Sequence, residues 1–198
     1  MVKYMIEDIF RTPVYSTQLN VDNDELWQDC LKIKRKHPGG NLISNRGGYQ
    51  SGQLLGCTDE KDYSFKSLSE SIAKQAGIFA EGINLEVKQL KDLWYNINNY
   101  KDHNIIHNHI GHNNKLSGVY YVKAPKNSGN LVLDHPSNLV ELTWAVNIPK
   151  GHHNTFTSSV WHFVPKPGQL LIFPCWLNHL VEPNYSKSPR VSFSFNIE

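Results

Sequence analysis

From Glu86 onward the chain consists of short segments rich in valine, tyrosine, phenylalanine and tryptophan, separated by proline, glycine and asparagine. Segments of this length and composition are typical of β-strands, and the breaks are typical of turns. Regularly spaced short strands favour a β-sandwich or jelly roll. The segments expected as strands are Glu86–Asn98, Asn104–His109, Leu116–Lys123, Asn130–Asp134, Leu142–Asn147, Ser158–Val164, Gln169–Phe173, Asn178–Pro183 and Arg190–Ile197.

The first part of the chain is predicted to form a mainly helical flank with some strand. A first helix is expected over Val21–Lys36, with Asp22 and Asn23 as suitable caps. A second is expected over Ser64–Gly82, and Asn41–Gly56, rich in glycine and polar residues, is predicted as a loop. The apolar residues of the second helix share one face: Phe65, Leu68, Ile72, Ala76 and Phe79.

One mixed domain accounts most simply for a chain of 198 residues, a length that can bury a core without covalent staples. No internal repeat, low-complexity tract or linker divides the sequence. The predicted fold is mainly β with flanking helices, with a helical and strand flank over about residues 1–85 and a jelly-roll catalytic core over about residues 86–198. The helices are expected to pack on one outer face of the sheets.

The composition is that of a globular protein without a nucleic-acid partner. Hydrophobic residues make up 39% of the chain and charged residues 19%, which is not typical of disorder. The formal net charge is only +2, four of the 20 basic residues are arginines, and no long basic run occurs. A nucleic-acid-binding surface therefore has no electrostatic support.

The sequence indicates a cytoplasmic protein. Glu7 and Asp8 interrupt the apolar stretch that an ordinary secretory signal needs, and no segment is apolar over the length of a membrane span. The three cysteines, Cys30, Cys57 and Cys175, are odd in number and widely spaced, which predicts neither a disulfide framework nor a CxxC zinc site.

A histidine pair, His107 and His109, offers the first candidate metal ligands. Side chains two residues apart on a strand point to the same face, so these two imidazoles should converge while Asn108 points away. Imidazole suits iron, zinc, copper and nickel. The pair alone is a weak signal, because the surrounding asparagine-rich stretch also carries His103 and His112 and is equally typical of a polar loop.

The carboxyl-terminal segment strengthens the metal interpretation. A turn, an apolar strand and a second turn, running from Pro167, deliver His179 to the start of another strand. In the strictly alternating strand that follows, Arg190 and Ser192 share the face opposite to the aromatic side chains. Such an arginine lies either at the surface or inside a barrel mouth. Inside a barrel it needs an anionic partner, because an unpaired buried charge is costly, and a carboxylate pairs with it best.

These residues resemble the iron(II)/2-oxoglutarate-dependent oxygenases, and more narrowly the prolyl-hydroxylase-like members and a branch of the superfamily found in marine bacteria and their phages. The resemblance is close in the second half of the chain and loose in the first, where the glycine-rich Gly47–Ser51 is also similar. Its specificity comes from order and spacing. The matching segments are Trp94–Asn98, His107–His109, Leu116–Val122, Pro167–His179 and Arg190–Asn196.

The resemblance implies a double-stranded β-helix, a cupin-like jelly roll that uses iron(II), 2-oxoglutarate and dioxygen. It implies that His107 and His179 bind iron, that Arg190, helped by Ser192, holds the distal carboxylate of 2-oxoglutarate, and that Tyr121 reaches the same co-substrate. Further contacts to the co-substrate or the pocket are expected from Asn96, Asn98 and Trp176. A bacterial or phage source is implied, with the host cytoplasm as the location of a viral protein.

The chain departs from the superfamily at one position, because His109 stands where an aspartate or glutamate is usual. An imidazole can complete the facial triad, but it supplies no negative charge. It also fills the space that halogenating relatives leave open for halide, which disfavours halogenation. Asp134, which follows the apolar Leu131–Leu133, is the reserve carboxylate ligand, although such an aspartate often caps a turn.

Two other classes stay open at this point. A cupin-like metal enzyme would use a histidine-rich barrel without 2-oxoglutarate, and would not need Arg190 or Ser192. A non-catalytic jelly-roll binding or structural module would make the histidines incidental. The sequence does not identify the substrate, which is a small molecule or a protein side chain, and a homodimer is one alternative for the oligomeric state.

Overall fold

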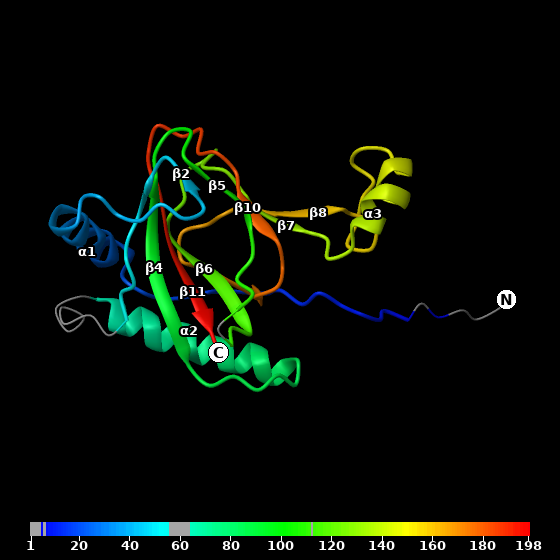
Figure 1. The fold of residues 1–198 in the computed structure, drawn as a ribbon, viewed down its shortest axis with the longest axis horizontal. Coiled ribbons are helices and arrows are strands. Elements are labelled where there is room, and N and C mark those ends of the chain that lie inside the picture. Colours follow the sequence, from blue (N-terminus) through cyan, green and yellow to red (C-terminus); the bar gives the residue numbers. More distant parts are fainter. Residues whose placement is uncertain (1–4, 6, 56–63, 112) are drawn as a thin grey trace.

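The computed structural model describes residue 5 and residues 7–55, 64–111 and 113–198. Two antiparallel sheets form the body of the molecule, a six-stranded sheet in the order β1-β9-β6-β11-β4-β3 and a five-stranded sheet in the order β2-β5-β10-β7-β8 (Figure 1). The larger sheet contains β1 Tyr15–Gln18, β3 Tyr49–Gln50, β4 Leu90–Asn98, β6 Leu116–Lys123, β9 Gln169–Pro174 and β11 Arg190–Ile197. The smaller contains β2 Asn45–Arg46, β5 His103–His107, β7 Leu131–Asp134, β8 Val160–Phe163 and β10 His179–Val181.

The first predicted helix is confirmed as α1, Asn23–Lys36. The side chain of Asp22 caps it by accepting hydrogen bonds from the backbone N–H groups of Asp24 and Glu25, which satisfies two donors that a helix start leaves free. Acidic residues in the first turn and basic residues in the last complement the helix dipole.

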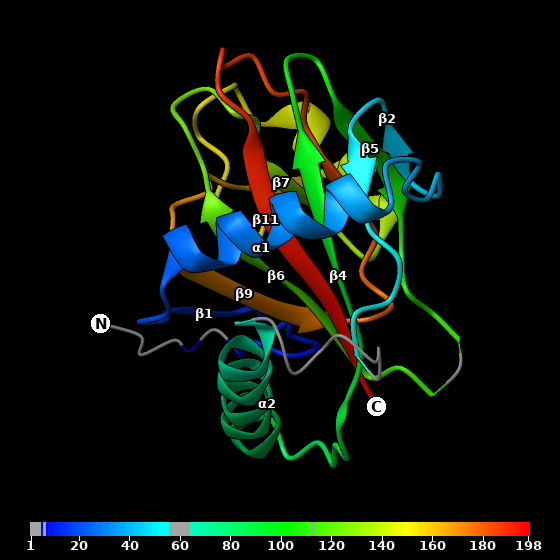
Figure 2. The same cartoon turned by 90° about the vertical axis from the view of Figure 1, so that its left-hand side faces the viewer.

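The second predicted helix is confirmed as α2, Phe65–Gly82, with the expected apolar face buried. Helix α1 packs on β6, and α2 packs on β4 and β9. Figure 2 shows both helices lying across the outer face of the larger sheet, as the sequence predicts. The main hydrophobic core therefore lies between this sheet and the two helices.

Strand β11 lies inside the larger sheet, between β6 and β4, and separates two environments. Val191, Phe193 and Phe195 are buried in the core under the helices. Arg190 and Ser192 face the opposite way, into the space between the two sheets. The alternation leaves a surface or an interior position open for the arginine, and the structure has the interior one. The resulting jelly roll is a double-stranded β-helix, as expected.

One predicted strand is wrong. Residues 142–147 lie in α3, Asn138–Thr143, and a 3₁₀ helix, Ala145–Asn147, within the connection from β7 to β8. Ser137 caps α3 by accepting a hydrogen bond from the N–H of Leu139. This connection projects from the sheets on the side away from α1 (Figure 1), so its apolar residues have no neighbouring strand to pair with.

Two further differences concern strand boundaries. Strand β5 ends at His107 rather than at His109. The segment predicted as a loop, Asn41–Gly56, contributes the two-residue strands β2 and β3, and β1 also comes from the amino-terminal flank. Both sheets therefore receive strands from before residue 86, and the division of the chain near residue 85 stays a prediction.

Some sequence-based expectations fall on Met1–Tyr4, Cys57 and His112, which lie outside the described residues. Cys30 and Cys175 are free and buried. Within the described part of the chain, no helix combines the length and the apolar character that a membrane span requires.

Candidate active site

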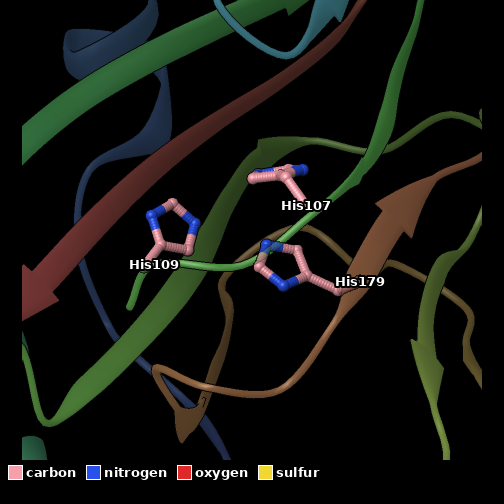
Figure 3. Close-up of side chains that lie close together, drawn as sticks. All are labelled: His107, His109 and His179. Carbon is pink, nitrogen blue, oxygen red and sulfur yellow. The ribbon is translucent and has the colours of Figure 1, made fainter. Parts of the chain in front are cut away.

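Two histidines of the smaller sheet and one from the loop after β5 meet in one place. His107 is the last residue of β5 and pairs in register with His179, the first residue of β10. Their ring centroids are 4.3 Å apart. With His109, each offers a ligand nitrogen, and the three nitrogens lie within 4.8 Å of one another. Figure 3 shows the rings gathered from β5, the loop that follows it and β10.

His109 reaches this group from a loop rather than from a strand. Its N–H donates to the carbonyl of Cys175 at 2.8 Å, and the amide of Asn114 donates to its carbonyl at 3.1 Å. The rings of His107 and His109 do converge, with centroids 5.1 Å apart. Asn108 turns to Asn178 and donates to its side chain at 2.8 Å. The sequence thus predicts the convergence but not its cause, since β5 has already ended.

Backbone carbonyls orient two of the rings. Nδ1 of His107 lies 2.7 Å from the carbonyl of Ile105, and Nδ1 of His179 lies 2.9 Å from the carbonyl of Leu177. A carbonyl can only accept, so each Nδ1 carries the proton and each Nε2 keeps a free lone pair. Such outer contacts fix the tautomer and orientation of metal-binding histidines.

The site favours neutral imidazoles. Burial lowers the pKa of His107, of His109 to about 4 and of His179 to about 3, and the neighbouring histidines lower the last two further. Asp92 acts in the opposite direction on His109, but its effect is smaller. At neutral pH all three rings are therefore uncharged and can act as ligands.

Behind the histidines, an inner cavity of about 40 Å³ lies between the two sheets, and Arg190 forms part of its wall. This arginine is 1% exposed. Its Nη1 donates to the carbonyls of Ser128 and Glu182, the second at 3.1 Å. Its Nη2 is buried without a hydrogen-bond partner among the described residues. A buried cationic donor without a partner is costly, so this atom marks a place for an anion.

Neutral polar side chains line the cavity beside the arginine, and the carboxylates of Asp102 and Glu182 lie near enough to raise its pKa against the lowering effect of burial. In the strand register Arg190 lies opposite Asn98, and Ser192 lies opposite both Asn96 and Tyr121. All four of these neighbours line the inner cavity. Burial raises the pKa of Tyr121 to about 12, while the charge of Arg190 opposes this rise. The Tyr121 hydroxyl stays protonated and has no hydrogen-bond partner in the described part of the chain, so it is a second free donor.

A larger cleft of about 500 Å³ lies on the other side of the histidines. Ser44, Trp94, His107 and His109 line both the cleft and the inner cavity. The ring of Trp94 lies against that of His109, with centroids 5.8 Å apart. The histidines therefore stand at the junction between a wide outer space and a narrow inner one that contains the free donors of Arg190 and Tyr121.

The donor set fits iron(II) and 2-oxoglutarate. Three neutral imidazoles suit a borderline metal such as iron(II) and leave coordination positions open. The unpartnered Nη2 of Arg190 fits one carboxylate of a dicarboxylic acid. His107, His109 and His179 could hold the metal, and Arg190, Tyr121 and Ser192 could hold the co-substrate.

Two expected site residues lie elsewhere. Asp134, at the end of β7, faces a different pocket beside Trp161 and is absent from the histidine group. Its backbone N–H donates to the carbonyl of Asn178 at 2.9 Å. Trp176 is 43% exposed in the turn between β9 and β10 and lines neither the cleft nor the cavity.

The tryptophan that does line the site is Trp94, for which the sequence alone predicts no role. A signal for it was present in the chain, because Trp94 alternates with buried apolar residues along β4 and shares a face with Asn96 and Asn98.

The jelly roll, the histidine group and the paired cavities define a metal-dependent oxygenase. Residues 92–196 match the family model described as "Putative 2OG-Fe(II) oxygenase", more than half of the chain, and the chain belongs to this family. It is an iron(II)- and 2-oxoglutarate-dependent oxygenase, with dioxygen as the second co-substrate. No curated protein sequence matches the chain.

Solved structures support the fold. A prolyl-4-hydroxylase from Pseudomonas putida matches with a TM-score of 0.63 and 12% identity, over 94% of this chain and 92% of that chain. A prolyl hydroxylase from Trichoplax adhaerens, in complex with a hypoxia inducible factor peptide, matches with a TM-score of 0.63 and 16% identity. The match covers 93% of this chain and 82% of that chain. A viral collagen prolyl hydroxylase from Paramecium Bursaria Chlorella virus-1 matches with a TM-score of 0.56 and 14% identity. The match covers 93% of this chain and 94% of that chain. At these identities the likeness establishes the fold alone.

Proposed function

We propose that this protein binds iron(II) through His107, His109 and His179, holds the distal carboxylate of 2-oxoglutarate in the inner cavity and hydroxylates a substrate in the outer cleft. When bound, iron(II) and 2-oxoglutarate together supply the activation of dioxygen, with release of succinate and CO2. The observation that carries the proposal is the unpartnered Nη2 of Arg190 in a cavity that the three histidines also line.

The remaining residues have positioning roles in this proposal. Arg190 receives the distal carboxylate of 2-oxoglutarate, with the hydroxyls of Ser192 and Tyr121 as neighbouring donors. Asn96 and Asn98 supply neutral amide groups along the same wall. No side chain needs to act as a general base, because the bound metal and co-substrate carry the chemistry.

The substrate is a small molecule or a protein side chain, and the net charge of +2 argues against nucleic acid. The cytoplasm is the proposed location. A reducing compartment keeps iron ferrous and agrees with the free state of the two described cysteines.

Anaerobic titration with iron(II) and then 2-oxoglutarate tests the function. The expected result is a weak visible charge-transfer band that requires both ligands. Arg190→Ala should weaken 2-oxoglutarate binding about 100-fold, because it removes the charge-assisted hydrogen bond that the free Nη2 can donate, while iron(II) affinity changes little. The affinity of Arg190→Lys for 2-oxoglutarate should lie between those of the natural protein and Arg190→Ala, since lysine keeps the charge but not the planar guanidinium.

Arg46→Ala is the matched control, because Arg46 is exposed and lines neither cavity. Equal loss of metal and co-substrate binding in both Arg190 variants would contradict the role of this arginine. Metal binding without the band would favour a cupin-like enzyme that does not use 2-oxoglutarate. Absence of both would favour a non-catalytic module.

A further inference from the structure

A row of inward-facing side chains runs the length of the site along the paired strands β4 and β11. The register pairs Asn98 with Arg190, Asn96 with Ser192, Trp94 with Ser194, and Asp92 with Asn196. The first three pairs line the inner cavity, and Asp92 and Asn196 line the outer cleft. At about 3.3 Å per residue, the cation of Arg190 and the carboxylate of Asp92 are placed at opposite ends of a path of roughly 20 Å.

The carboxylate of Asp92 is held in position by neutral partners. Gln53 Nε2 donates to Oδ1 at 3.0 Å and Asn196 Nδ2 donates to Oδ2 at 2.9 Å. No lysine or arginine of the described residues forms an ion pair with it. A carboxylate accepts about four hydrogen bonds, so two amide donors leave acceptor capacity free on the cleft side.

The cleft carries a single carboxylate. Asp92 is the one acidic side chain among the described residues that line it, and no lysine or arginine is among them. The other lining residues are amides, serines and apolar groups, including Trp94, Ile43 and Ile105. Such a surface suits a ligand with an aliphatic body and a single cationic group, because no lysine or arginine among the described lining residues would pair with an anionic one.

We propose that the substrate carries a protonated amine or guanidinium on an aliphatic stem and that Asp92 binds this cation. The inference rests on the proposed function, because it takes the cleft as the substrate site. Trp94 contacts His109, and Asp92 lies one strand repeat beyond it, roughly 7 Å along β4. The oxidised carbon therefore lies several bonds from the cationic group, with the stem packed against the indole.

Binding to the iron(II)- and 2-oxoglutarate-loaded protein under anaerobic conditions tests this assignment, read as a change in the visible band. One arm uses free amino acids, L-lysine against L-norleucine and L-arginine against L-citrulline. The other arm uses a short lysine peptide, blocked at both ends, against the same peptide with an acetylated lysine. Cations should bind at least about tenfold more tightly than their neutral counterparts, as a charged hydrogen bond provides. The arm that responds identifies the source of the cation.

Asp92→Asn should abolish the preference for cations while the band itself still forms. Asp92→Glu should retain part of the preference. Glu70→Gln removes the same charge from an exposed position on α2 and should leave the preference intact. Three results with an intact band would overturn the inference alone. Charged and neutral probes could bind equally, no cation could bind, or the preference for cations could survive in Asp92→Asn. A missing band would overturn the proposed function and the inference with it.

Discussion

His109 gives this metal centre an unusual charge. Similar oxygenases usually carry an aspartate or glutamate at this position, whereas burial here lowers the pKa of His109 to about 4 and keeps the ring neutral. With His107 and His179 also neutral, the three protein ligands contribute no negative charge. We expect that the dianionic co-substrate supplies the compensating charge, so that metal and 2-oxoglutarate bind with strong mutual dependence.

The two adjacent tyrosines of β6 provide a matched pair of variants. Tyr121 faces the inner cavity and its hydroxyl is free among the described residues, whereas the Tyr120 hydroxyl donates to Asn23 at 2.7 Å on the helix side of the sheet. Tyr121→Phe should weaken 2-oxoglutarate binding by about tenfold, the loss of one hydrogen bond to a charged group, with little change in stability.

Tyr120→Phe should show the opposite pattern, with lower stability and unchanged co-substrate affinity. Titration of the anaerobic iron(II) protein with 2-oxoglutarate, together with urea denaturation, measures both quantities. Equal 2-oxoglutarate affinities for the two variants would remove Tyr121 from the co-substrate site.

The buried histidines also predict a pH dependence of the metal-free protein. The pKa is about 4 for His109 and about 3 for His179, below the ordinary value of 6.5. Between these values and pH 6.5 the unfolded chain binds more protons than the folded one, so acid favours unfolding. The free energy of unfolding should fall as the pH decreases from 6.5 toward 4, and should be insensitive to these groups above 6.5.

Denaturant midpoints at pH 5 and pH 7, in the presence of a chelator, measure this effect. The double variant His109→Gln, His179→Gln should show a smaller difference between the two midpoints. An unchanged difference would assign the acid sensitivity to other groups.

At the level of elements, the sequence predicts best where both faces of a strand are buried. The bounds of β6 and β11 are predicted to the residue. In β6 both faces are rich in apolar residues, and in β11 apolar and polar positions alternate between a helix-covered core and a cavity. Helix α1 is predicted with its cap for a similarly local reason, since Asp22 satisfies the first N–H groups. The same alternation puts Arg190 on the face opposite the aromatic side chains, but only the resemblance to the oxygenases implies that this face is the inner one.

Elements that depend on distant partners are not predictable in this way. Strands β2 and β3 are two residues long and exist because β5 and β4 lie beside them. The apolar content of residues 142–147 is typical of a strand, but the segment projects from the sheets and folds as a helix. The position of Trp94 against His109 likewise depends on a loop whose path the sequence does not reveal.

The larger sheet is closely packed around Gly118 on β6. A Cβ atom at this position would collide with the ring of Phe195 and with the carbonyl of Leu171 on the neighbouring strand β9. The carbonyl belongs to the sheet backbone and cannot move away as a flexible side chain could. Gly118→Ala should therefore reduce the free energy of unfolding by about 3 kcal/mol, at the upper end of typical overpacking costs.

Chemical denaturation of the metal-free protein measures this loss. Gly77→Ala is the control, since a Cβ there meets nothing within 4 Å on α2 and should be neutral or slightly stabilising. Equal stability of the two variants would show that the sheet adjusts at Gly118.

At the scale of the molecule, the site joins the two sheets. The metal ligands come from β5, β10 and the loop after β5 in the smaller sheet, while Arg190 and Tyr121 come from β11 and β6 in the larger. Helices α1 and α2 cover the far side of the larger sheet (Figure 2). Neither helix contributes a residue to the described lining of the cleft. Ligands bound at the junction therefore connect layers that otherwise meet through the smaller hydrophobic cluster around Phe173 and Leu133.

This arrangement predicts that both ligands stabilise the whole protein and that the effect of 2-oxoglutarate depends on bound metal. A ligand present at 100 times its dissociation constant stabilises the folded state by about 2.7 kcal/mol. Iron(II), or redox-inert manganese(II), should raise Tm by itself. 2-Oxoglutarate should raise it strongly only when metal is present, because the neutral histidines leave the metal charge uncompensated until the dianion binds.

Thermal denaturation under anaerobic conditions, with each ligand alone and with both, measures the coupling, and a chelator should reverse it. Arg190→Lys should lose most of the increment from 2-oxoglutarate but keep the increment from metal. If 2-oxoglutarate raised Tm equally with and without metal, its carboxylates would be bound independently of the histidine centre. The junction between the two cavities would then not be where the ligands meet.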